Sequence, residues 1–310
     1  MSRLGAVSLL SLGLIVAASV APATASPVAK PKGSAGGSYV AIGDSFTAGQ
    51  GAAPYLGDCL RSQFASYPAI TAGSSSYREA LNFACSGADT TDMLRRVAVI
   101  DPRTKLKASL VTITVGGIDA GSNLVLAACA LDPASVPCET AVDTATANLQ
   151  TVVGPTLVRT YTAVAAEFPK ARIVVLNYPM LFDPSLATDP TFGSLAVTMN
   201  YATDLLNQVI LGAVRATNNP RVSLTDVTDE FAGHGIGSNV PYISFNSDPF
   251  DPFDPANFHP NALGNTAGYS AALRTDGAVR GRLTRSQKKG PPTGRPVTCG
   301  VVLVAAPEDL

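Results

Sequence analysis

The chain has 310 residues, of which 46% are hydrophobic and 15% are charged, and its formal net charge is −1. A chain of this length and composition can bury a substantial apolar core, so we expect a folded globular protein rather than a disordered one. The near-neutral charge gives no general attraction for nucleic acid or for anionic membranes, and we expect no nucleic-acid partner.

The N-terminus has the pattern of a secretory signal peptide. A basic residue precedes an apolar stretch over 4–20, and Ala23-Thr24-Ala25 supplies small residues for cleavage. Residues 1–25 are therefore expected to be removed on export, which predicts a secreted, extracellular protein with a flexible lead-in over 26–37. No later stretch is long and apolar enough to suggest a transmembrane segment.

The tripeptide Gly43-Asp44-Ser45 ends an apolar run over 39–42 and precedes a short helical pattern. This order predicts a buried strand, a sharp turn and a serine at the start of a helix. Such a turn projects the hydroxyl away from the sheet, and free amides at the helix start can stabilise a developing negative charge. Taken alone, the tripeptide is equally typical of an ordinary capped turn.

Beyond this turn, strand patterns alternate with helical ones. Residues 51–76 are expected to be a loop. Strands are expected at 81–84, 109–115, 171–177 and 221–224, and helices at 90–99, 121–130, 142–168 (broken or restarted at Pro155), 200–217 and 265–273. This alternation predicts an α/β fold with a parallel sheet covered on both faces. Sites in such sheets lie beyond the carboxyl ends of the strands.

The composition changes after residue 273. Residues 274–310 hold seven Lys or Arg against three acidic residues, and a Gly-Pro-Pro-Thr-Gly stretch breaks any helix. We therefore expect one α/β domain over 38–273 and a disordered basic tail over 274–310. Attachment to an anionic envelope polymer is the alternative role for this tail.

Five cysteines in an exported chain favour disulfide pairing. Cys59 with Cys85 and Cys129 with Cys138 are the economical pairs, because each closes a local loop, and Cys299 is left over in the tail. With two histidines, no Cys-x-x-Cys and no His-Glu-x-x-His, the chain is not expected to hold a metal. It also has no complete dinucleotide or phosphate loop, and we expect no cofactor.

Only two histidines could serve as a general base. His259 lies in an Asn-Phe-His-Pro-Asn loop just before the last expected helix, and His234 follows a Phe-Ala-Gly segment. Either could have a purely structural role. Paired with an exposed turn serine, His259 becomes the candidate base for Ser45.

Four blocks of sequence stand in order along the chain. They are Ile-Gly-Asp-Ser-Phe-Thr-Ala-Gly at 42–49, Asn-Phe-Ala-Cys-Ser-Gly-Ala at 82–88, Thr-Ile-Thr-Val-Gly-Gly-Ile-Asp at 112–119, and His-Pro-Asn-Ala-x-Gly at 259–264. Together they resemble the SGNH-type, or GDSL-type, serine esterases and lipases, in particular the secreted actinobacterial lipase branch. The resemblance implies a flavodoxin-like, three-layer α/β/α hydrolase that cleaves carboxylic esters of lipids or small acyl esters without a cofactor. We expect it to be a monomer.

The resemblance also assigns roles by position. Ser45 would be the nucleophile and His259 its general base, and the backbone amides of Ser45 and Gly87 would form the oxyanion hole. The family's third donor is an Asn in a Gly-x-Asn-Asp motif, and here Ile118 stands in its place. An aliphatic side chain cannot donate, and losing one such donor lowers turnover by ~10²–10³. Activity is therefore expected to be reduced. The neighbouring Asp119 is retained, in a position that suits helix capping.

The second difference from the family's pattern concerns the group that orients His259. The family often has an Asp three residues before the His, where this chain has Ala256. Asp254 and Asp251 lie nearby but out of register, and some relatives use a main-chain carbonyl, which Ala256 can offer. A Ser-His pair with backbone support is the preferred arrangement. The alternative is a non-catalytic secreted binding protein that kept the scaffold.

Overall fold

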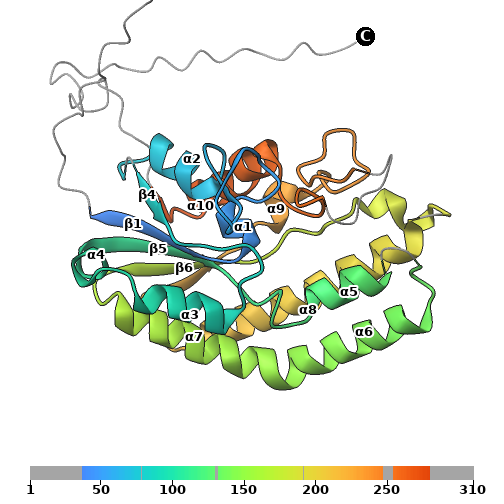
Figure 1. Ribbon diagram of the computed structural model, residues 1–310, viewed down its shortest axis with the longest axis horizontal. Coiled ribbons are helices and arrows are strands. Elements are labelled where there is room, and N and C mark those ends of the chain that lie inside the picture. The colour runs from blue at the N-terminus through green and yellow to red at the C-terminus, as the bar shows by residue number, and fades with distance from the viewer. Residues whose placement is uncertain (1–36, 78, 130–131, 191, 247–253, 280–310) are drawn as a thin grey trace, which may run out of the picture. The chain divides into compact units, whose positions relative to one another are not determined.

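The core of the molecule is a five-stranded parallel sheet, seen in a computed structural model that describes residues 37–77, 79–129, 132–190, 192–246 and 254–279 (Figure 1). Its strands are β1 (Ser38–Gly43), β4 (Ala80–Asn82), β5 (Ala108–Thr114), β6 (Arg172–Leu176) and β7 (Val222–Thr225). They lie in the order β4-β1-β5-β6-β7, and every neighbouring pair is parallel. By position in the chain this is the 2-1-3-4-5 order of flavodoxin-like folds.

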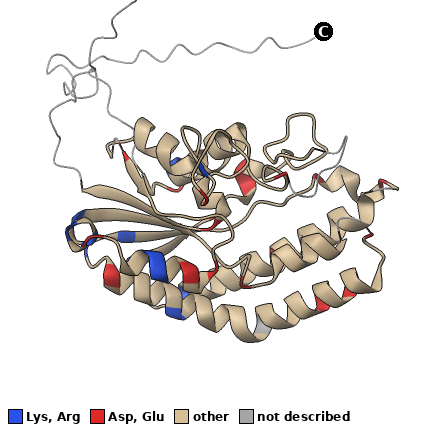
Figure 2. Ribbon diagram, in the orientation of Figure 1, with Lys and Arg blue, Asp and Glu red and all other residues tan. Residues whose placement is uncertain are grey.

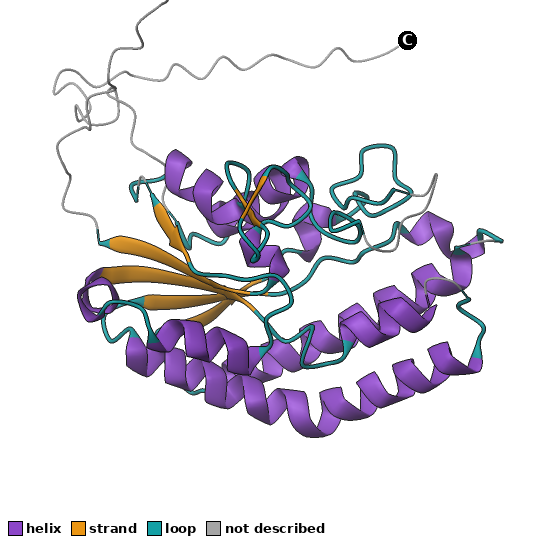
Figure 3. Ribbon diagram, viewed as in Figure 1, coloured by secondary structure: helices purple, strands orange, loops and turns teal. Residues whose placement is uncertain are grey.

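Side chains along each strand alternate between two buried faces. In β1, Tyr39 and Ala41 belong to one apolar cluster, whereas Val40 and Ile42 belong to the other. Since both faces are covered, the strands are apolar throughout instead of alternating with polar residues. The sheet is thus the middle of three layers, and Figure 3 shows helices on each side of it. The expected three-layer α/β/α architecture is confirmed.

One face carries the short elements on which the candidate site is built. They are α1 (Ser45–Ala48), α2 (Tyr67–Ser74), α9 (Thr228–Phe231), the π-helical turn η3 (Gly264–Tyr269) and α10 (Ser270–Thr275) (Figure 1). Helix α2 and the small antiparallel pair β2 (Tyr55–Leu56) and β3 (Arg61–Ser62) lie in the segment expected to be a loop, so that expectation was wrong.

The reason that α2 escaped detection is its weak apolar periodicity. Proline, glycine and serine occupy several of its positions, and its stability comes from tertiary contacts instead. Tyr67 stacks on Tyr269 with ring centroids 5.1 Å apart, and its amide donates to Asn265 Oδ1 at 2.8 Å. Those partners come from the far end of the chain.

The opposite face is covered by α3 (Thr90–Ala98), α7 (Gly154–Glu167) and α8 (Gly193–Ala216), and α4 (Pro102–Lys107) leads into β5. Helix α8 begins earlier than the expected residue 200, because Leu195 and Met199 extend its buried stripe toward the N-terminus. The 3₁₀ turn η2 (Pro184–Thr188) precedes it.

A helical hairpin of α5 (Ser122–Cys129) and α6 (Val136–Asn148) extends from this layer. Helix α6 starts before the expected residue 142 and passes through a π-helical turn, η1 (Leu149–Val153), into α7. The expected restart at Pro155 is confirmed: α7 begins at Gly154, and Pro155 lies in its first turn, where no backbone donor is required.

Both expected disulfides are present. Cys129 pairs with Cys138 across the α5–α6 hairpin, and Cys59 pairs with Cys85 beside the turn that contains Gly87. Cys299 lies outside the described residues, as do the expected signal peptide and residues 280–310. The described chain ends with Val279 buried, and within the described ranges no helix is long and apolar enough to cross a membrane.

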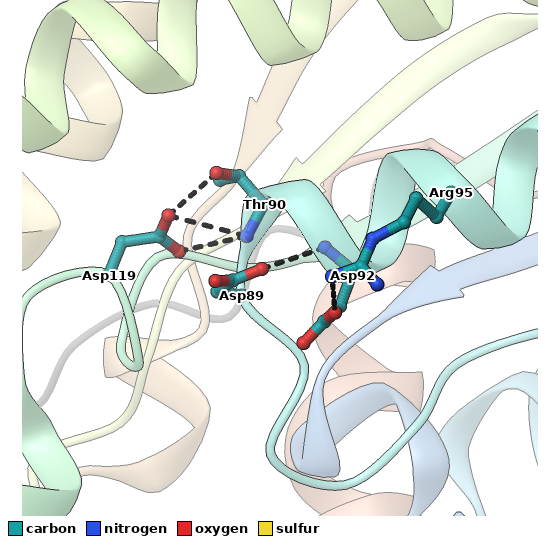
Figure 4. A network of polar contacts seen from close by, with 5 residues as sticks. All are labelled: Asp89, Thr90, Asp92, Arg95 and Asp119. Atoms are coloured by element: carbon teal, nitrogen blue, oxygen red, sulfur yellow. Dashed lines mark hydrogen bonds and ion pairs between the residues drawn. The ribbon is translucent and has the colours of Figure 1, made fainter.

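A polar network ties the end of β5 to the start of α3 (Figure 4). The Asp119 carboxylate accepts hydrogen bonds from the Thr90 amide at 3.1 Å and from the Thr90 hydroxyl at 2.6 Å. Asp89 caps the same helix by accepting from the Asp92 amide at 2.7 Å. Asp119 therefore caps α3 rather than a helix of its own, which fixes the turn after β5.

Replacing this carboxylate tests its structural role. The substitution Asp119→Ala leaves two donors of Thr90 without their acceptor, so the free energy of unfolding should fall by roughly 1–3 kcal/mol. Urea titration followed by circular dichroism measures the change. The control is Arg95→Ala in the same network, whose exposed ion pair with Asp92 should contribute less than about 1 kcal/mol. Equal stability losses for the two variants would contradict the assignment.

Candidate active site

Ser45 is placed by a turn that only glycine permits. Gly43 has φ of 139°, and a Cβ on it would lie 2.2 Å from the carbonyl oxygen of Thr114 on β5. Asp44 then caps α1 by accepting from the Phe46 amide at 3.0 Å. Because β1 lies between β4 and β5, the serine stands at the point where the strand order reverses, beyond the carboxyl ends of the strands.

The structure brings His259 to this serine. Its Nε2 lies 2.8 Å from Ser45 Oγ, and its Nδ1 lies 2.7 Å from the carbonyl oxygen of Asn257. A carbonyl can only accept, so Nδ1 carries the proton in this contact. In the neutral ring, Nε2 is then an acceptor that faces the serine hydroxyl.

The orienting carbonyl is not the one expected. The Ala256 carbonyl accepts from the backbone amide of His259 at 3.2 Å, and the Asp254 carboxylate accepts from the Ala256 amide at 2.8 Å. Neither contacts the imidazole; the carbonyl of Asn257 does. The reason is local geometry: Phe258 has φ of 63°, which turns the chain so that the ring folds back onto the carbonyl two residues before it. Asp251 lies outside the described residues.

The surroundings of His259 keep its ring neutral. Burial lowers the pKa of His259 from 6.5 to about 4, and the bond to the Asn257 carbonyl opposes that shift only in part. Among the described residues no carboxylate contacts the ring. The imidazole is therefore unprotonated at neutral pH and can accept a proton.

Two residues that sequence reasoning missed hold the histidine loop against the serine turn. A Cβ on Gly51 would lie 2.6 Å from the carbonyl oxygen of Pro260 and 2.9 Å from the carbonyl carbon of His259. Gln50 Nε2 donates to the Pro255 carbonyl at 2.5 Å. The only signal in the sequence is the glycine itself, since its partners lie about two hundred positions away.

Two residues that line the cavity were expected to supply oxyanion donors from their backbone amides. The Cys85 amide donates to the Gly43 carbonyl at 3.0 Å, which sets the following turn, with Gly87 at φ of 72°, beside the serine. Ser45 and Gly87 both line the cavity, and within the described chain neither amide nitrogen has an acceptor. Ile118 lines the cavity too, and its aliphatic side chain offers no donor.

Beneath the serine lies a buried carboxylate. The Tyr178 hydroxyl and the Thr114 hydroxyl both donate to Asp44, the latter at 2.7 Å, and the Gly117 amide donates to the Tyr178 oxygen at 3.2 Å. Burial raises the pKa of Asp44 to about 6, against the lowering effect of these bonds. The carboxylate thus couples the serine turn to the turn after β5.

The cavity that opens at Ser45 and His259 has a volume of about 240 Å³. Helix α5, which forms one of its walls, carries no charged residue (Figure 2). The opposite wall comes from α8 and from the chain after β6. Most of the lining is aliphatic, so the cavity suits an apolar chain attached to a reacting carbonyl. Its aliphatic side chains include Val125, Leu126, Leu149, Leu181, Met199 and Leu206.

The second histidine lies apart from this cavity. His234 stacks on Tyr242 with ring centroids 3.8 Å apart, and its Nδ1 is 2.8 Å from the carbonyl oxygen of Val240. These contacts hold a loop, which agrees with the structural alternative. In the part of the chain that the structure describes, no group of three or more His, Cys, Asp or Glu residues is placed to bind a metal ion.

Solved structures share this arrangement of strands and helices. Phospholipase A1 from Streptomyces albidoflavus superimposes with a TM-score of 0.67 at 32% identity, covering 77% of this chain and 99% of that protein. An extracellular lipase from Streptomyces rimosus gives a TM-score of 0.66 at 31% identity, with the same coverage.

Sequence comparison points the same way. A Streptomyces rimosus lipase is 34% identical over 243 residues, 76% of this chain and 85% of that protein. Lipase 1 of Streptomyces coelicolor is 32% identical over 267 residues, 85% and 94% of the two chains. The model of the GDSL-like lipase/acylhydrolase family matches residues 41–267, most of the chain. This protein therefore belongs to the GDSL-like lipase/acylhydrolase family.

Proposed function

We propose that this protein is a secreted serine ester hydrolase in which Ser45 is the nucleophile and His259 is the general base. One observation carries the proposal: His259 Nε2 lies 2.8 Å from Ser45 Oγ while its Nδ1 is held by a main-chain carbonyl. A base within hydrogen-bond reach of a hydroxyl, fixed in the tautomer that accepts, is what activates a serine.

The reaction would follow from this geometry in two halves. Ser45 Oγ bonds to the ester carbonyl carbon as its proton moves to His259 Nε2, and the carbonyl oxygen becomes an oxyanion near the amides of Ser45 and Gly87. The imidazolium then gives its proton to the departing alcohol, which leaves an acyl group on Ser45. A water molecule, deprotonated by His259, releases the acid and restores the serine.

The substrate class is an ester with an apolar acyl group. The aliphatic cavity beside Ser45 supports this, and so do relatives described as lipases and as a phospholipase A1. Export is supported by the N-terminal signal pattern together with two disulfides, which persist in oxidising compartments.

A non-catalytic binding protein on the same scaffold is the second candidate. The observation that favours it is Ile118, whose side chain lines the cavity and cannot donate to an oxyanion. A binder would keep the apolar cavity but show no turnover that depends on Ser45.

Removing the nucleophile separates these two functions. The substitution Ser45→Ala should lower the hydrolysis rate of a p-nitrophenyl ester by at least about 10³-fold, because no acyl-enzyme can form. Ser223→Ala on β7, an exposed serine, is the control and should retain full activity. Turnover that is unchanged in Ser45→Ala, or absent from the wild type with every ester tried, would reject the esterase.

The pH profile tests the state of His259. Only the neutral imidazole accepts the serine proton, and the lowered pKa of about 4 keeps it neutral well below pH 6.5. We expect kcat/KM for a soluble short-chain ester to fall only as the pH drops below 6.5 toward 4. Circular dichroism at each pH controls for unfolding. An acidic limb centred at or above pH 6.5 would contradict the lowered pKa of His259.

Crowding at Gly51 tests whether the loop contact sets the Ser-His distance. In Gly51→Ala the new methyl group would push the His259 loop away, and a displacement near 1 Å can lower kcat by about 10²-fold with little change in KM. The matched control is Gly57→Ala: Gly57 also has positive φ but nothing within 4 Å of an added Cβ. If the two variants have the same kcat, the close contact does not position the histidine.

A further inference from the structure

The oxyanion site has two backbone donors where the family motif supplies three. Ser45 and Gly87 offer their amides, and Ile118 occupies the position of the asparagine. A developing oxyanion is stabilised by each donor that is already oriented toward it, so a nearby polar side chain with a free N–H would raise turnover. The inference below rests on the proposed esterase function.

Most polar side chains around the cavity are committed elsewhere. The Thr203 hydroxyl donates to the Met199 carbonyl at 2.8 Å. The Ser86 hydroxyl donates to the Gln50 side chain, whose Nε2 in turn donates to the Pro255 carbonyl. The Tyr178 hydroxyl donates to Asp44. These bonds hold the walls of the cavity and fix the direction of each donor.

Two side chains on the first turn of α5 are not committed. Ser122 and Asn123 line the cavity together with Ser45, and neither side chain has a hydrogen-bond partner among the described residues. Their turn is anchored to the glycine before Ile118, because the Ser122 amide donates to the Gly117 carbonyl at 3.0 Å. The two side chains without partners therefore lie just after the turn that carries Ile118 at the position of the family's asparagine donor.

The two differ in reach and in surroundings. Ser122 Oγ lies 3.5 Å from the position that a Cβ on Gly117 would occupy, so its short hydroxyl packs into the turn. Asn123 lines the cavity and is exposed to solvent, and its longer side chain ends in a carboxamide with two N–H groups. A carboxamide is also the chemical group that Ile118 has replaced.

We propose that the Asn123 carboxamide donates the third hydrogen bond to the oxyanion, from the first turn of α5. In the tetrahedral intermediate one Nδ2 proton points at the former carbonyl oxygen, alongside the amides of Ser45 and Gly87. Because an exposed side chain must be ordered for each turnover, its contribution is smaller than that of a buried donor, about 10- to 10²-fold in kcat.

Kinetics with a soluble p-nitrophenyl ester test this assignment. Asn123→Ala should lower kcat by about 10- to 10²-fold with KM within about twofold, since the bond forms only in the transition state. A boronic acid, whose boron bonds to Ser45 Oγ in a tetrahedral anionic adduct, should bind more weakly by a similar factor. The control is Leu124→Ala, the next residue of α5, which does not line the catalytic cavity and should match the wild type.

A second substitution asks whether Asn123 replaces the family's donor. Added to Asn123→Ala, the substitution Ile118→Asn should restore kcat to within about threefold of the wild type. Made in the wild type alone, Ile118→Asn should raise kcat by less than about threefold. Full turnover and boronate affinity in Asn123→Ala would overturn the proposal, as would an equal gain from Ile118→Asn in both backgrounds. Turnover that survives Ser45→Ala would instead reject the esterase function itself.

Discussion

The hydrogen bond between Ser45 Oγ and His259 Nε2 is the contact on which the rest of the site depends. Each partner alone is an ordinary polar residue in a turn, and the proposed mechanism requires the two to be in contact. Two steric constraints allow Ser45 and His259 to come into contact. The glycine at 43 lets the chain turn sharply beside β5, and the glycine at 51 lets the histidine loop lie against the chain that follows the serine. Both are steric, and both act through backbone atoms that cannot move aside cheaply.

The buried polar groups beneath Ser45 connect the chain segments that carry the site. Asp44 is a buried carboxylate, which is unfavourable by itself, and its pKa is raised to about 6 by that burial. Its bonds to the hydroxyls of Thr114 and Tyr178 join three segments at the carboxyl edge of the sheet. Asp119, in the turn after β5, joins that turn to the start of α3 by accepting a hydrogen bond from the Thr90 hydroxyl. The serine turn and the turn after β5 are therefore fixed by the hydrogen bonds of these two carboxylates.

The histidine is oriented by the carbonyl of Asn257 and not by an acid. A carbonyl fixes the tautomer as a carboxylate would, but in the proposed reaction it would bring no charge to stabilise the imidazolium. Burial lowers the pKa of His259 to about 4, and the hydrogen bond to the Asn257 carbonyl opposes that shift only in part. In the proposed mechanism, the charge of the transition state would then be stabilised mainly by the oxyanion donors. Polar side chains near Ile118 could therefore affect the rate.

The sequence determined the elements whose pattern is local. Apolar strands, the turn at Gly43-Asp44-Ser45 and the two short-range disulfides could be predicted because each is specified by neighbouring residues. Helix α2 could not, since Tyr67 is stabilised by Asn265 and Tyr269 from the end of the chain. The same limit applies to the site: the serine and histidine were recognisable as residue types in motifs, but the orienting carbonyl of Asn257 depends on the backbone turn at Phe258, and the contact of Gly51 depends on how distant segments pack. Only the tertiary structure sets distances between such segments, because no local pattern encodes them.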